Sequence, residues 1–200
     1  LDGQLVTFGI KPTHPETGYG YLELSKAATA QAVPLKAFVE KPDLTNAEKM
    51  VQSENFLWNS GIFLFQAKDI IEAFKKYSSS NLDAVNLSLT NSIDDLGFCR
   101  LNLTDWIKTE NISIDYAIME KSDNLSVVPF SAGWSDLGGW DAVWRENVSK
   151  INGVKTSNNT TAIDCENSLI RSEDGSIEVV GIGLKNIITV AMKDAVLVAD

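Results

Sequence analysis

The sequence predicts an α/β protein in which a sheet covered by helices precedes a small all-β tail. Two observations lead to this fold class. Up to about residue 150, β-rich apolar runs alternate with segments of helical periodicity, which is typical of α/β architecture. After about Val148 the helical periodicity ends and short β-rich runs follow one another. We therefore expect two parts, residues 1–150 and 151–200, with a boundary near Lys150.

Local patterns predict the elements of the first part. Thr45, with Glu48 three residues later, has the spacing of a capping box, so a helix is expected to begin there. Apolar residues at helical spacing predict a helix over 67–77, and lysines near its end suit the helix dipole. The other predicted elements are strands over 4–10, 19–24, 32–39, 61–66 and 125–130, and helices over 82–89, after Ser113 and over 138–147.

Composition excludes several classes of protein. With 44% apolar and 22% charged residues, the 200-residue chain has the mix of a globular protein. Its net charge of −10 argues against a nucleic-acid partner. No apolar run reaches the roughly 18 residues of a membrane span. The single His14 cannot form a zinc site alone, and the distant Cys99 and Cys165 do not form a disulfide framework, which points to a reducing cytoplasm.

The segment "FVEKP" ends a predicted strand with an adjacent acid and base. The carboxylate of Glu40 could accept hydrogen bonds from two vicinal hydroxyls of a sugar, and Lys41 could bind a phosphate. Pro42 is expected to bias Lys41 to an extended conformation. Taken alone, the pair is better explained as a solvated ion pair that contributes under ~1 kcal/mol.

Two further segments place polar or small residues beside aromatic ones. In "TGYGY", Gly18 and Gly20 would allow close approach of the backbone to a ligand, with Tyr19 as a lid or stacking surface; an ordinary turn is the alternative. In "LWNSGIF", the Asn59 amide could bind a sugar hydroxyl, or it could satisfy the backbone of a local turn.

Two acids are candidates for different roles. In "GWSDLGGW", Asp136 precedes two glycines and could bind Mg²⁺ through its oxygens, or it could cap the following helix. In "SIDY", Asp115 is better explained as a favourable charge at a helix start.

The order of these motifs carries more information than any one of them. "FGIKPTHPETGYGYLEL", "FVEKPD", "WNSGIFLF", "SIDYAIMEK" and "GWSDLGGWDAVW" together resemble the mannose-1-phosphate guanylyltransferase family, including the guanylyltransferase part of enzymes that also carry phosphomannose isomerase. The resemblance runs from residue 5 to 144 and extends into the tail. It implies a Rossmann-like nucleotide-diphospho-sugar transferase sheet followed by a small left-handed β-helix. It also implies a reaction that joins GTP and mannose 1-phosphate to give GDP-mannose and pyrophosphate.

The resemblance assigns roles by motif. Glu40 would hold sugar hydroxyls and Lys41 the sugar phosphate, while Tyr19, Gly20 and Asn59 would line the sugar pocket. Asp136 would be the second of two aspartates that bind Mg²⁺. Lys41 and Asp136 would therefore carry the catalysis, which needs alignment and charge neutralisation rather than a protein nucleophile.

The family's Gly-rich phosphate loop and first magnesium aspartate have no counterpart here, and the chain starts at Leu1 without Met. We therefore expect a fragment that is inactive alone and whose strands keep exposed edges, through which it could form homo-oligomers. Two alternatives stay open: a transferase for another sugar or base, and a non-catalytic module that binds a sugar phosphate.

Overall fold

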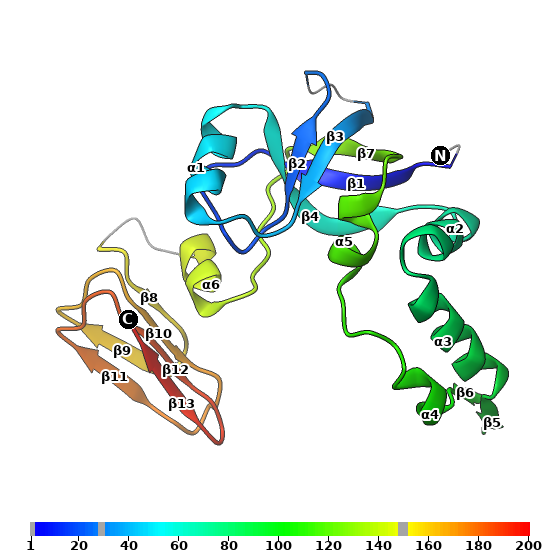
Figure 1. Ribbon diagram of the computed structural model, residues 1–200. Coiled ribbons are helices and arrows are strands. Elements are labelled where there is room, and N and C mark those ends of the chain that lie inside the picture. Colours follow the sequence, from blue (N-terminus) through cyan, green and yellow to red (C-terminus); the bar gives the residue numbers. More distant parts are fainter. Residues whose placement is uncertain (1–2, 28–30, 148–151) are drawn as a thin grey trace. The chain divides into compact units, whose positions relative to one another are not determined.

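The computed structural model describes residues 3–27, 31–147 and 152–200 (Figure 1). The chain forms two compact units, Leu1–Trp134 and Ser135–Asp200. The boundary predicted near Lys150 lies outside the described residues. Helix α6 (Trp140–Asn147) belongs to the second unit, where the Trp144 indole Nε1 donates a hydrogen bond of 2.8 Å to the Gly153 carbonyl.

Five strands of the first unit form a mixed sheet that closes on itself. β1 (Leu5–Ile10), β4 (Phe56–Leu64), β2 (Tyr21–Leu24) and β3 (Val33–Val39) are antiparallel neighbours in that order. β7 (Leu125–Phe130) then pairs antiparallel with β3 and parallel with β1. Each strand thus has two neighbours, so the free edges that we expected are not found among these five strands.

The predicted elements are largely confirmed, with informative exceptions. Helix α2 occupies Ala67–Tyr77 as predicted, and Ser113 caps α5. Helix α1 is capped by Asp43 rather than Thr45, because the Asp43 carboxylate accepts a hydrogen bond of 2.9 Å from the Asn46 backbone. The other elements of this unit are α1 (Leu44–Gln52), α3 (Ser79–Thr90), β5 (Ile93–Asp95), β6 (Phe98–Arg100), α4 (Leu103–Trp106), α5 (Ile114–Ala117) and the 3₁₀ turn η1 (Met119–Lys121).

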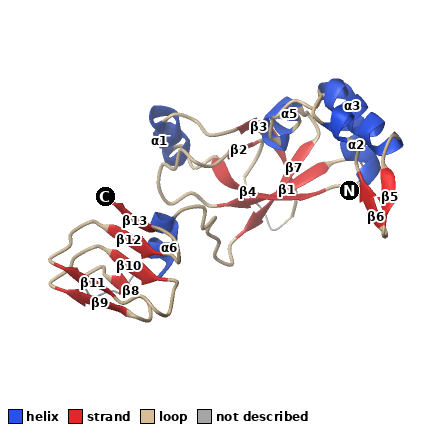
Figure 2. Ribbon diagram, turned by 90° about the horizontal axis from the view of Figure 1, so that it is seen from below, coloured by secondary structure: helices blue, strands red, loops and turns tan. Residues whose placement is uncertain are grey.

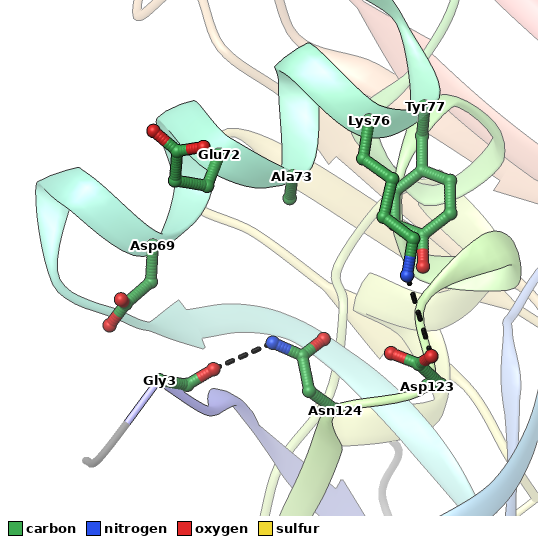
Figure 3. A pocket seen from close by; sticks show the side chains of 8 residues that line it. All are labelled: Gly3, Asp69, Glu72, Ala73, Lys76, Tyr77, Asp123 and Asn124. Carbon is green, nitrogen blue, oxygen red and sulfur yellow. Dashed lines mark hydrogen bonds and ion pairs between the residues drawn. The ribbon is translucent and has the colours of Figure 1, made fainter.

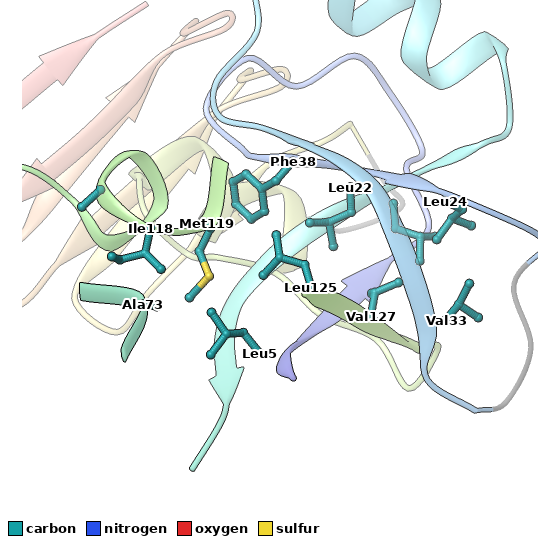
Figure 4. Close-up of a cluster of buried hydrophobic side chains, with 12 residues drawn as sticks. Leu5, Leu22, Leu24, Val33, Phe38, Ala73, Ile118, Met119, Leu125 and Val127 are labelled. Carbon is teal, nitrogen blue, oxygen red and sulfur yellow. The ribbon is translucent and has the colours of Figure 1, made fainter. Parts of the chain in front are cut away.

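The main core joins the closed sheet to three helical segments. Figure 4 shows side chains from the strands meeting Ile118 and Met119 beside η1, together with Ala73 of α2. Its fully buried members are Leu5, Leu22, Val33, Ile118, Met119 and Val127. Because this cluster lies between the strands and η1, it fixes the position of the chain that leads from α5 into β7.

A second, smaller core lies under α1. Tyr21 and Trp58, from neighbouring positions on β2 and β4, are buried with Ala47 of α1. Burial of such large aromatic side chains stabilises the end of the sheet from which the "FVEKP" segment leaves.

Most strand pairs of the second unit are parallel, and its last two strands, Ile188–Ala191 and Val196–Ala199, pair antiparallel (Figure 2). The pairs Leu169↔Ile188 and Thr160↔Val179 both join residues nineteen positions apart. One sheet has the order β13 (Val196–Ala199), β12 (Ile188–Ala191), β10 (Leu169–Ser172), β8 (Lys155–Thr156), and the other contains β11 (Val179–Ile182) and β9 (Thr160–Ile163). The β-rich tail predicted from the sequence is therefore present as a regular stack.

The corners of this stack repeat the same backbone conformation. Gly153, Asn167 and Asn186 each have positive φ and each precede the first paired residue of a strand by two positions. Asparagine and glycine are the residues that adopt this left-handed conformation at low cost.

None of the helices in the described residues combines the length and the apolar character that a membrane crossing needs.

Substitution of Ile118 by alanine tests the core. Ile118 is 0% exposed, so Ile118→Ala should lower the free energy of unfolding by about 2–5 kcal/mol through lost burial and a cavity. Ile93→Ala, at a side chain that is 64% exposed, is the matched control and should change it by less than about 0.5 kcal/mol. Urea unfolding followed by tryptophan fluorescence measures both, and equal effects would contradict this assignment of the core.

Candidate functional site

The candidate site begins where β3 ends. Glu40 follows directly on this strand, and its side chain is only 7% exposed. A Cβ added to Gly20 would lie 2.6 Å from Glu40 Oε2 and 3.3 Å from the Asn59 Cβ. The missing side chain of Gly20 is therefore what lets the carboxylate and Asn59 approach the same point.

Lys41 does not have the extended backbone that we expected before Pro42. Its φ is +47°, in the left-handed region, and its backbone N–H donates to the Tyr19 carbonyl at 3.2 Å. Neighbouring side chains in an extended strand point to opposite faces, but this turn places Lys41 Nζ 3.4 Å from Glu40 Oε1. The local preference is overridden by the tertiary bond, and the result is an acid and a base on one side.

Asn59 lies inside β4, because this strand begins five residues earlier than the predicted strand over 61–66. The register between β1 and β4 shifts next to it, and Gly61 has a φ of +72°. Such a bulge redirects side chains. The Asn59 backbone donates to the Gly20 carbonyl at 2.8 Å, so Glu40, Gly20 and Asn59 are brought together.

Tyr19 lies in a row of aromatic rings. It meets Trp58 edge to face at 5.2 Å between centroids and Trp134 at 5.4 Å, and His14 meets Trp58 at 5.0 Å. Edge-to-face packing of this kind stabilises a fixed ring position. The structure therefore places Tyr19 as part of a wall beside Gly20, and its role as a lid stays a prediction.

Sequence reasoning did not place two acids at this site. Glu120, from η1, accepts a hydrogen bond of 2.8 Å from the Glu40 backbone, and Asp115, from α5, faces the Asn59 amide at 3.4 Å. Both acids belong to the "SIDYAIMEK" motif. The sequence alone favours a role for Asp115 as a charge at a helix start and gives Glu120 no separate role.

The electrostatics of the site disfavour ionised carboxylates. Burial and then the nearby Asp115 raise the pKa of Glu40, while Lys41 opposes the shift. Burial likewise raises the pKa of Asp115, again with Lys41 opposing. Perturbed carboxylates gathered around one amine are typical of functional sites.

Asp136 belongs to the second unit. It is exposed, and the following Leu137 has a φ of +48°. The described residues contain no group of three or more His, Cys, Asp or Glu side chains that could hold a metal ion. Mg²⁺ prefers oxygen ligands and is often bound by one or two carboxylates plus substrate phosphates, so Asp136 suits the ion as a single ligand only.

A separate pocket of about 200 Å³ lies beside α2 (Figure 3). Lys76 forms an ion pair of 3.4 Å with Asp123 across it, and Asn124 donates a hydrogen bond of 2.6 Å to the Gly3 carbonyl. None of the residues predicted for the site lines this pocket.

Comparison with known proteins assigns the chain to a family. Residues 2–152 match the sequence profile described as nucleotidyl transferase. The chain belongs to the nucleotidyl transferase family. The matched region of this nucleotidyl transferase includes Glu40, Lys41, Asn59 and Asp136.

Individual relatives of this nucleotidyl transferase carry a more specific name. A mannose-1-phosphate guanylyltransferase of Sinorhizobium fredii is 41% identical over 98% of this chain and 38% of its own length, and that of Escherichia coli is 39% identical over 99% and 42%. A Thermus thermophilus structure described as mannose-1-phosphate geranyltransferase superposes with a TM-score of 0.78 at 26% identity, over 99% of this chain and 56% of that one. The chain thus spans about two fifths of the length of these curated relatives.

The close contact at Gly20 can be tested with a second glycine as control. In Gly20→Ala the new Cβ would overlap Glu40 Oε2, so the free energy of unfolding should fall by about 1–3 kcal/mol. In Gly18→Ala the nearest atom is a flexible carboxylate oxygen of Glu16 at 3.3 Å, and little change is expected. Equal denaturant midpoints for the two variants would contradict the close approach of Glu40 to Gly20.

The raised pKa of Glu40 predicts a pH dependence of stability. As pH rises from the ordinary glutamate pKa towards the raised one, the unfolded chain releases this proton before the folded chain does, so the free energy of unfolding falls. Glu40→Gln should remove this contribution, and its stability relative to the parent should increase as pH rises through the range between the ordinary and the raised glutamate pKa. Urea midpoints across this range measure it, with Glu72→Gln, at a side chain that is 68% exposed, as control. A Glu40→Gln curve parallel to that of the parent would rule the effect out.

Proposed function

We propose that this chain supplies the sugar-phosphate site of a mannose-1-phosphate guanylyltransferase, which joins GTP and mannose 1-phosphate to give GDP-mannose and pyrophosphate. One observation carries the proposal: the left-handed turn at Lys41 places its amine and the buried Glu40 carboxylate on the same side, next to Asn59. Similarity to relatives of that name over nearly the whole chain supports the choice of reaction.

The proposed roles follow from the chemistry of each group. Glu40 accepts hydrogen bonds from hydroxyls of the sugar, and Asn59 binds a further hydroxyl. Lys41 Nζ, which is 56% exposed at the side chain, binds the phosphate and offsets part of its charge. Tyr19 and Gly20 form the wall that sets the depth of the pocket.

In the transfer step an oxygen of the sugar phosphate forms a bond to the α-phosphorus of GTP, and the bond from that phosphorus to the bridging oxygen of pyrophosphate breaks. The chain's own contribution is to hold the attacking oxygen in line and to reduce repulsion between the two anions. We propose Asp136 as one of the carboxylates that hold Mg²⁺, which would neutralise charge on the phosphates. The residues that bind GTP are proposed to lie mostly outside this chain.

For the tail we propose a left-handed β-helix. Parallel pairing at a spacing of nineteen residues and left-handed corners at Gly153, Asn167 and Asn186 support a coiled stack.

We propose that the enzyme works in the cytoplasm as part of polysaccharide biosynthesis.

Titration of mannose 1-phosphate into the chain tests the site directly. Lys41→Ala should weaken binding by about 10- to 100-fold, because a charge-assisted contact to the phosphate is lost. Isothermal titration calorimetry measures the dissociation constants. Lys36→Ala is the matched control, because Lys36 lies on strand β3, which ends just before Glu40 and Lys41, and pairs with Glu23 at 2.6 Å instead of joining the site.

Equal affinities of the parent and Lys41→Ala would show that the phosphate is bound elsewhere. Binding of glucose 1-phosphate as tight as that of mannose 1-phosphate would favour a transferase for another sugar.

A further inference from the structure

The amide oxygen of Asn59 has two hydrogen-bond contacts within the protein. Thr7 Oγ1 lies 2.8 Å from Asn59 Oδ1, and the backbone N–H of Gly61 donates to the same oxygen at 3.2 Å. Thr7 and Asn59 are 1% and 8% exposed, so these bonds are held away from water. The Ile62 carbonyl lies 3.1 Å from the same Thr7 hydroxyl, which has one hydrogen to donate, so the Gly61 bond is the donor contact to this oxygen that has no competitor.

The orientation of this amide is fixed by the Gly61 backbone. A backbone N–H can only donate, so the Asn59 atom that faces it must be the oxygen rather than the nitrogen. The nitrogen consequently faces Asp115, whose Oδ1 lies 3.4 Å from Asn59 Nδ2. One of the two amide hydrogens is directed to this carboxylate, and among the described residues no acceptor is found for the other.

Asp115 is not needed to begin its own helix. Ser113 is the N-cap of α5, and its side chain accepts a hydrogen bond from the Tyr116 backbone. The Asp115 carboxylate is instead half-buried among Asn59, Lys41 and Glu120. Its hydrogen bonds to its own backbone and to the Ser113 side chain serve the helix start, but the contact with the Asn59 amide reaches beyond the helix.

Glu40, which lies beside Asn59 at the site, has the opposite hydrogen-bonding character. Glu40 and Asn59 both border the position that a Gly20 Cβ would occupy. An ionised carboxylate can only accept hydrogen bonds, whereas the remaining amide hydrogen of Asn59 can only donate. A ligand in contact with both must donate to Glu40 and accept from Asn59, through one hydroxyl or through two.

We propose that Asp115, together with Thr7, fixes the orientation of the Asn59 amide so that its nitrogen is available as a hydrogen-bond donor; we call these contacts the lock. Asp115 is thereby a positioning residue that sets which sugar hydroxyl is recognised. The lock itself stands on the contacts of Asn59, while its consequence for sugar recognition rests on the proposed function. Without Asp115 the amide is held only through its oxygen, by Thr7 and Gly61, and its nitrogen loses the contact that directs its hydrogens.

The lock can be observed without any ligand. The side-chain NH₂ signals of Asn59, assigned by their loss in Asn59→Asp, report its hydrogen bonding in ¹⁵N-labelled chain. Asp115→Ala should move these signals, whereas Asp115→Asn, which keeps an acceptor oxygen, should retain most of the parent position. Asp123→Ala, which removes an acid that is 81% exposed, should leave them unchanged. Unmoved Asn59 signals in a folded Asp115→Ala chain would overturn the proposal.

Recognition is tested with deoxy and deoxyfluoro analogues of mannose 1-phosphate. Fluorine accepts hydrogen bonds weakly and cannot donate, so at the hydroxyl that meets Asn59 the fluoro analogue should bind better than the deoxy analogue. At a hydroxyl that meets Glu40 the two analogues should lose affinity equally. Asp115→Ala should weaken binding of mannose 1-phosphate by about three- to tenfold and remove the advantage of the fluoro analogue.

The outcomes separate the two proposals. If the parent chain does not bind mannose 1-phosphate, the proposed function is contradicted and the Asn59 signals alone decide whether the lock exists. If the parent binds and Asp115→Ala keeps both its affinity and the fluoro advantage, the positioning role of Asp115 is wrong.

Discussion

The candidate site depends on a carboxylate that the fold keeps almost entirely out of water. The Glu40 carboxylate would have to move if Gly20 carried a side chain, and the Glu40 backbone N–H donates to the Glu120 carboxylate. Burial without full compensation raises its pKa, so the folded chain holds this group at an energetic cost. Such a cost is expected where a protein keeps hydrogen-bonding capacity available for a ligand.

The charges around Glu40 show how a strongly acidic chain could still accept an anion. The net charge is −10, yet the amine of Lys41 is brought to the site by one left-handed residue. The same amine also lowers the pKa values of Glu40 and Asp115 against the effect of burial. A single cation therefore offsets part of the cost of holding two acids at this site.

Local patterns predicted most of the helices and strands, because α2 and β7 are long enough to show their periodicity. The hairpin of β5 and β6 was missed, since three-residue strands have no measurable period. Motifs predict Glu40, Lys41 and Asn59 as site residues, but the contact of Glu40 with Glu120, eighty residues away, follows only from the fold. The left-handed turn at Lys41 contradicted the local preference before proline because a tertiary hydrogen bond to Tyr19 overrides it.

Closure of the five-stranded sheet also has a consequence for synthesis on the ribosome. β1 pairs with β7, and Leu5 meets Leu125 only after another 120 residues have been translated. At about 5–20 residues per second, roughly 6–24 s pass during which β1 lacks its parallel neighbour. During this interval its apolar residues have no completed core to enter, so the nascent chain is a natural client for chaperones until β7 emerges.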